Sequence, residues 1–145
     1  MSQVNQSGSS LEKKPRCFSV RVLVEFAAAH HIRGYDGECS RPHGHNWKVE
    51  VEAATAQLNS IGISVDFKVL KSMVKTLIDR FDHQDINTIM PFIEINPTAE
   101  TLSHFFFEEL ERQVQHSKPL AALEVRRVTV WENDRCAASF GLAGV

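Results

Sequence analysis

The chain has 145 residues, of which 43% are hydrophobic and 23% are charged, with a formal net charge of −2. This length is that of one ordinary domain, and a pI near 6.4 gives nucleic-acid binding no electrostatic support. No run approaches the ~18 consecutive apolar residues of a membrane-spanning helix, and three cysteines make no disulfide framework, which favours a reducing cytoplasm.

The N-terminal part of the chain predicts a tail followed by two strands. Residues 1–15 are polar and lack the apolar stretch of a secretory signal, so we expect a disordered tail. Residues 16–145 are expected to form one domain. Apolar residues alternate from 17 to 30 and again from 43 to 56, which predicts two strands. The glycine-rich stretch between the strands is typical of a loop.

The second half predicts two helices and two more strands. Asp66 and Thr98 are the expected N-caps of the helices. The apolar stripe of the first helix consists of Phe67, Leu70, Val74, Leu77, Ile78 and Phe81, and that of the second of Leu102, Phe105, Phe106, Leu110 and Val114. Strands are expected at 125–131 and 136–140.

The resulting order, ββααββ, predicts an α+β domain with a four-stranded antiparallel sheet and both helices on one face. The two outer strands of such a sheet leave unpaired edges. Pairing with neighbouring subunits would remove these edges, so we expect an oligomer.

Three of the seven histidines give the strongest chemical signal. His43 and His45 lie two residues apart on a predicted strand, so their side chains share one side. If the first two strands pair antiparallel, His30 lies beside them with the same parity. Three neutral imidazoles suit Zn²⁺ and leave a fourth position open, as in catalytic zinc sites. The alternative is that these are ordinary core or loop histidines, but such residues would not need the shared parity. His31 has the opposite parity and is a competing ligand.

Cys39 lies in the loop before this pair and has two interpretations. As a fourth ligand it would close the site and make it structural. As an uncoordinated thiolate near the cation it would be a general base, and its loop position favours this role. Cys17 and Cys136 lie in strand-like contexts and are expected to be small buried residues.

Two further charged segments have ordinary explanations when their residues are considered alone. Asp82-His83 directly follows a predicted helix, where His83 is best explained as a C-terminal cap. Glu132 is best explained as an exposed charge at a strand end.

Several motifs together resemble a known family. Phe26-Ala27-Ala28-Ala29-His30, followed by Cys39-Ser40-Arg41-Pro42-His43-Gly44-His45, resembles the zinc signature of the 6-pyruvoyl-tetrahydropterin synthase superfamily. The three residues between Cys39 and His43 are similar to the spacing in the bacterial 6-carboxytetrahydropterin synthase branch. Shorter matches follow in order, namely Val65-Asp66-Phe67, Asp82-His83, Pro97-Thr98-Ala99-Glu100 and Trp131-Glu132. The resemblance extends from Cys17 to Phe140.

This resemblance implies the T-fold, or tunnelling fold, whose subunits form oligomeric barrels, usually hexamers of two trimers with active sites between subunits. The implied activity is that of a zinc-dependent lyase with one Zn²⁺ per subunit. It would convert 7,8-dihydroneopterin triphosphate to 6-carboxy-5,6,7,8-tetrahydropterin, releasing acetaldehyde and triphosphate. This step belongs to queuosine biosynthesis and requires no contact with tRNA.

The implied site residues form three groups, which are the zinc ligands, the acid/base residues and the pterin contacts. The zinc ligands would be His30, His43 and His45. The acid/base residues would be Cys39, Asp82 and His83, and the pterin contacts would be Glu132, Glu100 and Thr98. Asp82 and His83 would serve the zinc of a neighbouring subunit. His31 stands where the family commonly has Arg, and Arg33, Arg41 and Lys68 are candidates to bind the triphosphate instead.

Two alternatives stay open. The first is another reaction of the same superfamily, either that of a 6-pyruvoyl-tetrahydropterin synthase or that of an aldolase-like pterin enzyme. The second is a non-catalytic, zinc-stabilised assembly module.

Overall fold

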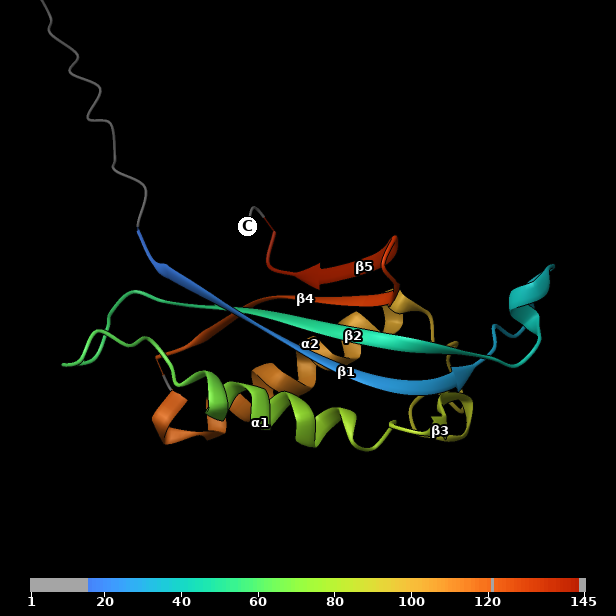
Figure 1. Ribbon diagram of the computed structural model, residues 1–145, viewed down its shortest axis with the longest axis horizontal. Coiled ribbons are helices and arrows are strands. Elements are labelled where there is room, and N and C mark those ends of the chain that lie inside the picture. Colours follow the sequence, from blue (N-terminus) through green and yellow to red (C-terminus); the bar gives the residue numbers. More distant parts are fainter. Residues whose placement is uncertain (1–15, 121, 144–145) are drawn as a thin grey trace, which may run out of the picture.

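The computed structural model describes residues 16–120 and 122–143 (Figure 1). The expected disordered tail at 1–15 lies outside these residues. The strands are β1 (Phe18–His30), β2 (His43–Thr55), β3 (Gln84–Asp85), β4 (Glu124–Asn133) and β5 (Cys136–Gly141), and the helices are α1 (Phe67–Ile78) and α2 (Ala99–His116). Short 3₁₀ turns occupy Glu38–Ser40, Ile86–Thr88 and Lys118–Leu120. No helix in this described part of the chain has the length and apolar character to cross a bilayer.

The strands form one sheet in the order β3-β1-β2-β4-β5. The four long strands pair antiparallel, as the alternation predicts. The fifth strand, β3, was not predicted; it pairs parallel with β1 at Ala28 and Ala29. Two residues are too few to show an alternating pattern, so this strand has no signal in the sequence. The α+β fold class is confirmed, with a five-stranded sheet in place of a four-stranded one.

Strands β1 and β2 form an unbroken antiparallel ladder that determines the rest of the site. It runs without a register shift from the Phe18–Thr55 pair to the His30–His43 pair. Apolar side chains of one parity therefore bury together, and Phe26 stacks on Trp47 with ring centroids 6.1 Å apart. The ladder ends with His30 directly opposite His43.

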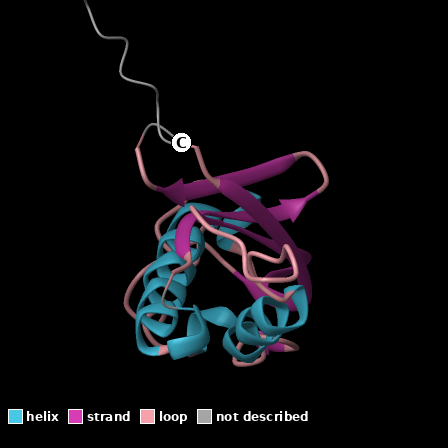
Figure 2. Cartoon of the chain, turned by 90° about the vertical axis from the view of Figure 1, so that its left-hand side faces the viewer, coloured by secondary structure: helices cyan, strands magenta, loops and turns pink. Residues whose placement is uncertain are grey.

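Both helices cover the same face of the sheet (Figure 2). Helix α1 lies against β1, and α2 lies against β4 and β5. The two predicted N-caps are confirmed, because the Asp66 carboxylate accepts a hydrogen bond from the Lys68 amide and Thr98 forms a capping box with Thr101. The apolar stripes form the core between helices and sheet, with Phe106 in edge-to-face contact with Phe26 and Phe81.

Three predicted burials are wrong. Phe67 is 53% exposed because it is the first residue of α1 and precedes the turns of the helix that pack on the sheet. Cys17 and Cys136 are both exposed. Cys17 precedes the first residue of β1, and Cys136 begins β5, the last strand in the sheet order.

Candidate metal centre

Three histidines meet at the end of the β1–β2 ladder, on the inward parity that the sequence predicts. The potential ligand atoms of His30, His43 and His45 all lie within 4.8 Å of one another. The ring centroid of His30 lies 4.5 Å from that of His43 and 5.1 Å from that of His45. The Trp47 ring contacts His30 and His45 on the core side, with centroids 4.8 and 5.2 Å away. The strand register therefore converges three imidazoles on one point.

The hydrogen bonds of these rings leave nitrogens available for a metal. His30 Nδ1 lies 2.7 Å from the Pro97 carbonyl oxygen, and His43 Nδ1 lies 2.8 Å from that of Arg41. A carbonyl oxygen can only accept, so Nδ1 of each ring carries the proton and Nε2 keeps its lone pair. The Nε2 atoms of His30 and His45 are buried without a hydrogen-bond partner among the described residues. Such orphaned atoms are costly, and a bound metal ion would satisfy them.

Electrostatics also favour the form of histidine that binds a metal. Burial and, to a smaller extent, the neighbouring histidines lower the pKa of His30 to about 4, against the opposing effect of the Pro97 hydrogen bond. Burial likewise lowers the pKa of His45, although the nearby Glu132 carboxylate partly offsets this. These two imidazoles are therefore neutral at pH 7, as metal coordination requires. The donor set fits Zn²⁺.

The histidines open into a cavity of about 700 Å³, which we call the histidine cavity. Its lining includes the three histidines together with Cys39, Arg41 and Glu132. Cys39 lies in the 3₁₀ turn Glu38–Ser40 and is exposed. Its sulfur is not among the ligand atoms that cluster within 4.8 Å. Cys39 thus lines the cavity without completing a four-ligand group.

The predicted acid/base pair, Asp82 and His83, does not line the histidine cavity. The Asp82 carboxylate lies 2.9 Å from His83 Nδ1 and accepts a hydrogen bond from the Ala27 amide at 3.0 Å. That backbone hydrogen bond is the main reason why the pKa of Asp82 is lowered. His83 is not a helix cap, because α1 ends at Ile78 with Asp79 as its C-cap.

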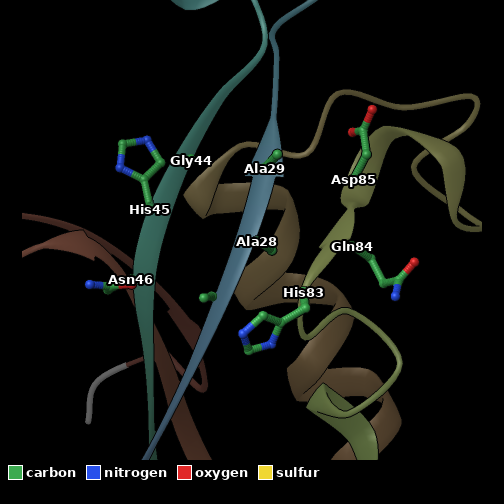
Figure 3. A pocket seen from close by; sticks show the side chains of 9 residues that line it. Ala28, Ala29, Gly44, His45, Asn46, His83, Gln84 and Asp85 are labelled. Carbon is green, nitrogen blue, oxygen red and sulfur yellow. The ribbon is translucent and has the colours of Figure 1, made fainter.

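His83 lines a second cavity, of about 570 Å³, which we call the outer cavity. Figure 3 shows His83 projecting from the segment beside β1, whereas His45 projects from β2. His45 contributes to both cavities, but neither Asp82 nor His83 lines the histidine cavity. The two groups of expected acid/base residues therefore do not share a cavity in one chain.

Several of the remaining predicted substrate contacts do not line the histidine cavity. Thr98 and Glu100 do not line the histidine cavity, and the Thr98 hydroxyl is engaged in the cap of α2. The Arg33 guanidinium donates to the carbonyls of Phe92 and Ile95.

Of the three candidates for phosphate binding, Arg41 is the one that lines the histidine cavity. Lys68 lines grooves beside α1 instead. The contact of the Pro97 carbonyl with His30 was missed, because nothing in the local pattern signals a bond between residues 67 positions apart.

Comparison with known proteins gives a consistent result. A family model described as 6-pyruvoyl tetrahydropterin synthase matches residues 19–142. A curated relative from Archaeoglobus fulgidus, named "Putative 6-carboxy-5,6,7,8-tetrahydropterin synthase", is 37% identical over 115 residues, covering 79% of this chain and 88% of the relative. The 6-carboxy-5,6,7,8-tetrahydropterin synthase of Haemophilus influenzae is 28% identical over 137 residues, covering 79% of this chain and 92% of the relative.

Solved structures show the same fold. The 6-pyruvoyl tetrahydropterin synthase of Caenorhabditis elegans superposes with a TM-score of 0.74 at 20% identity, covering 88% of this chain and 97% of the other. The corresponding structure from Plasmodium vivax has a TM-score of 0.64 at 18% identity, covering 85% and 97%. At these identities the likeness supports the shared fold alone.

Proposed function

Because the chain belongs to the 6-pyruvoyl tetrahydropterin synthase family, we propose that it is a zinc-dependent lyase acting on 7,8-dihydroneopterin triphosphate. The proposed products are 6-carboxy-5,6,7,8-tetrahydropterin, acetaldehyde and triphosphate, and the first would serve queuosine biosynthesis. The curated relatives named for this carboxy product support the choice of reaction. The observation that carries the proposal is the convergence of His30, His43 and His45 on a cavity that Cys39 also lines.

The three histidines would hold one Zn²⁺ per subunit through their unprotonated nitrogens. A zinc ion bound there would act as a Lewis acid toward oxygen atoms of the substrate and acidify the neighbouring protons. The chain contributes to this function by keeping His30 and His45 neutral through burial, which lowers the pKa of each ring, and by holding His30 and His43 through backbone carbonyls. Three protein ligands leave room for the substrate.

Cys39 would remove and return protons as the general base. Its exposed position on the cavity lining, outside the cluster of ligand atoms, supports this role over that of a fourth ligand. A positioned acid or base contributes typically 10²–10⁴-fold to the rate. Cys39 is therefore the residue whose loss should separate catalysis from metal binding.

His83, oriented by Asp82, would supply the opposite acid/base function to the site of a neighbouring subunit. This arrangement is supported by the position of His83, which lines the outer cavity of its own chain and not the histidine cavity. The proposed assembly is a homo-oligomer, a hexamer of two trimers, in which the edges of the sheet pair between subunits. Glu100 and Thr98 lie outside the histidine cavity and enter the proposal only as contacts with the site of a neighbour.

Two charged residues of the histidine cavity would recognise the two ends of the substrate. The Glu132 carboxylate can accept hydrogen bonds from the ring N–H and amino groups of the pterin. The Arg41 guanidinium can bind the triphosphate, because it is exposed and lines the cavity. Arg33 is less suited, since its guanidinium already donates to two backbone carbonyls.

The test is to incubate the zinc-loaded protein with 7,8-dihydroneopterin triphosphate and to identify the products by mass spectrometry. We expect the carboxy product together with acetaldehyde. A pyruvoyl product or a simple aldol cleavage would instead assign one of the other reactions of the superfamily. Absence of pterin binding, combined with loss of fold and oligomer on chelation, would assign a zinc-stabilised assembly module.

A further inference from the structure

Beyond the end of β1, two asparagine side chains bind the backbone of His31 and Arg33. Asn87 Oδ1 accepts a hydrogen bond from the His31 amide at 2.8 Å, and Asn87 Nδ2 donates to the His31 carbonyl at 2.9 Å. Asn96 makes the same pair of bonds to Arg33, at 2.8 and 2.9 Å. We call the side chains of Asn87 and Asn96 the asparagine clamp.

The clamp continues the edge of the sheet where β3 stops. Strand β3 pairs with β1 at Ala28 and Ala29, and the two asparagines then bind His31 and Arg33, at the alternate spacing of a strand edge. A side-chain amide offers the same donor and acceptor as a peptide group. The two side chains therefore take the place of further strand residues.

Both members of the clamp are themselves anchored. Asn87 is only 7% exposed, and its backbone amide donates to the Asp85 carboxylate at 3.0 Å. The Asn96 carbonyl accepts a hydrogen bond from the Thr101 hydroxyl in the first turn of α2, at 2.6 Å. The clamp thus fastens the segment after β1 to the turn that follows β3 and to the start of α2.

The opposite edge of the clamped segment reaches the loop that carries Cys39. Ile32 lies between the two clamped residues, and its amide donates to the Cys39 carbonyl at 2.8 Å. Ile32 and Cys39 both line the histidine cavity. Because Ile32 is covalently joined to both clamped residues, fixing the backbone of His31 and Arg33 also fixes the amide that holds Cys39.

We propose that Asn87 and Asn96 are positioning residues that hold Cys39 at the mouth of the histidine cavity through the amide of Ile32. The catalytic consequence rests on the proposed function, in which Cys39 is the general base. The structural connection from the two asparagines through the Ile32 amide to Cys39 does not depend on that function. A displacement of about 1 Å in a reacting group can lower a rate about 100-fold, so the clamp would affect turnover although neither asparagine lines the cavity.

The test compares Asn87→Ala with a matched control, Asn59→Ala. The Asn59 side chain likewise makes two hydrogen bonds to the backbone, because its Oδ1 accepts from the amides of Ile61 and Ile63 at 3.0 and 2.9 Å. It follows the far end of β2 from His43, in the loop that leads to α1 (Figure 1). The control therefore removes the same kind of contact far from the histidine cavity.

Three quantities would be measured for each variant, namely the hydrogen-exchange rate of the Ile32 amide, the zinc content, and kcat and KM per zinc-loaded chain. For Asn87→Ala we expect Ile32 to exchange at least about tenfold faster, because the segment that carries its amide is no longer held at His31. We expect kcat to fall about 10- to 100-fold with retained zinc and little change in KM. Asn59→Ala should leave all three quantities at their wild-type values.

An unchanged exchange rate at Ile32 in Asn87→Ala would overturn the proposal, and so would a wild-type kcat per zinc-loaded chain. A purely structural role would lower the yield of folded protein without changing that kcat. If the wild-type protein shows no turnover, the proposed function fails, while the exchange rates still decide whether the clamp holds the Cys39 loop. If Asn87→Ala does not fold, Asn96→Asp replaces it; this variant keeps the acceptor for Arg33, loses the donor, and should show smaller changes in the same directions.

Discussion

The histidine cavity and the outer cavity are built in different ways, although both lie at the same end of β1. The histidine cavity depends on a ladder of two 13-residue strands, which places His30 opposite His43 by register. The outer cavity depends on a turn after α1, in which His83 has a φ of 57° and its amide donates to the Ala27 carbonyl. A ladder positions several side chains together, whereas the turn positions one side chain through its own hydrogen bonds. Within one chain His83 lines the outer cavity and Cys39 lines the histidine cavity, and His45 lines both; under the proposed function, a complete acid/base site would combine residues of two chains.

Substitution of Cys39 should have the largest effect. It would show whether metal binding and catalysis depend on different residues of the histidine cavity. For Cys39→Ala we expect turnover to fall by about 10²- to 10⁴-fold, the usual contribution of a general base, while zinc stays near one per chain. Metal analysis and steady-state kinetics would check this result. As a control, His43→Ala should lose zinc and activity together. Loss of zinc from Cys39→Ala would show instead that the thiolate is a ligand.

Mixing two inactive variants would test whether the two cavities belong to different chains. Cys39→Ala and His83→Ala should each be inactive alone, because each lacks one acid/base group. When the two are unfolded, mixed in equal amounts and reassembled, about a quarter of the sites would combine an intact histidine cavity with an intact neighbouring His83. We therefore expect recovery of about a quarter of the wild-type rate. A mixture as inactive as its components would place both groups in one chain.

Substitution of Glu132 should have a smaller effect, confined to the substrate. Hydrogen bonds to a charged group contribute about 1.5–3 kcal/mol, so Glu132→Ala should weaken pterin binding on the order of 10- to 100-fold. Zinc content should not change, since Glu132 is not among the clustered ligands. Glu94→Ala, an exposed glutamate outside the histidine cavity, is the matched control. Equal pterin affinity in the two variants, measured by titration calorimetry, would rule out the anchoring role.

The pH dependence of stability should distinguish the buried histidines from the exposed ones. In the folded, zinc-free protein His30 takes up a proton only near pH 4, whereas in the unfolded chain it does so near 6.5. The unfolded state therefore binds more protons between these values, and the free energy of unfolding falls as the pH drops from 6.5 to 4. The contribution of His30 is about 3 kcal/mol over this range.

Urea unfolding of the zinc-free protein at several pH values would measure this effect. The decrease in the free energy of unfolding between pH 6.5 and 4 should be smaller in His30→Asn than in the wild type. It should be unchanged in His116→Asn, which removes an exposed histidine at the end of α2. An identical decrease in wild type and His30→Asn would contradict the buried, neutral state of His30.

The sequence predicts the long strands and the convergence of the histidines because both follow from local rules. Alternation defines the inward face of a strand, and antiparallel pairing of consecutive strands brings His30 next to His43. The same rules cannot predict β3, because its two residues are too few to show an alternating pattern. They also cannot predict the contacts of Asn87 with His31 or of Pro97 with His30, because these join residues 56 and 67 positions apart. Such contacts depend on where the turns lie once the core has packed.

The most direct measurement is X-ray absorption at the zinc edge of the purified, zinc-loaded protein. If His30, His43 and His45 bind the metal and Cys39 stays free, the spectrum should show imidazole nitrogens at about 2.0–2.1 Å and no sulfur neighbour. A sulfur atom at about 2.3 Å would mean that Cys39 closes the site. That result, or a folded protein that takes up no zinc, would contradict the account.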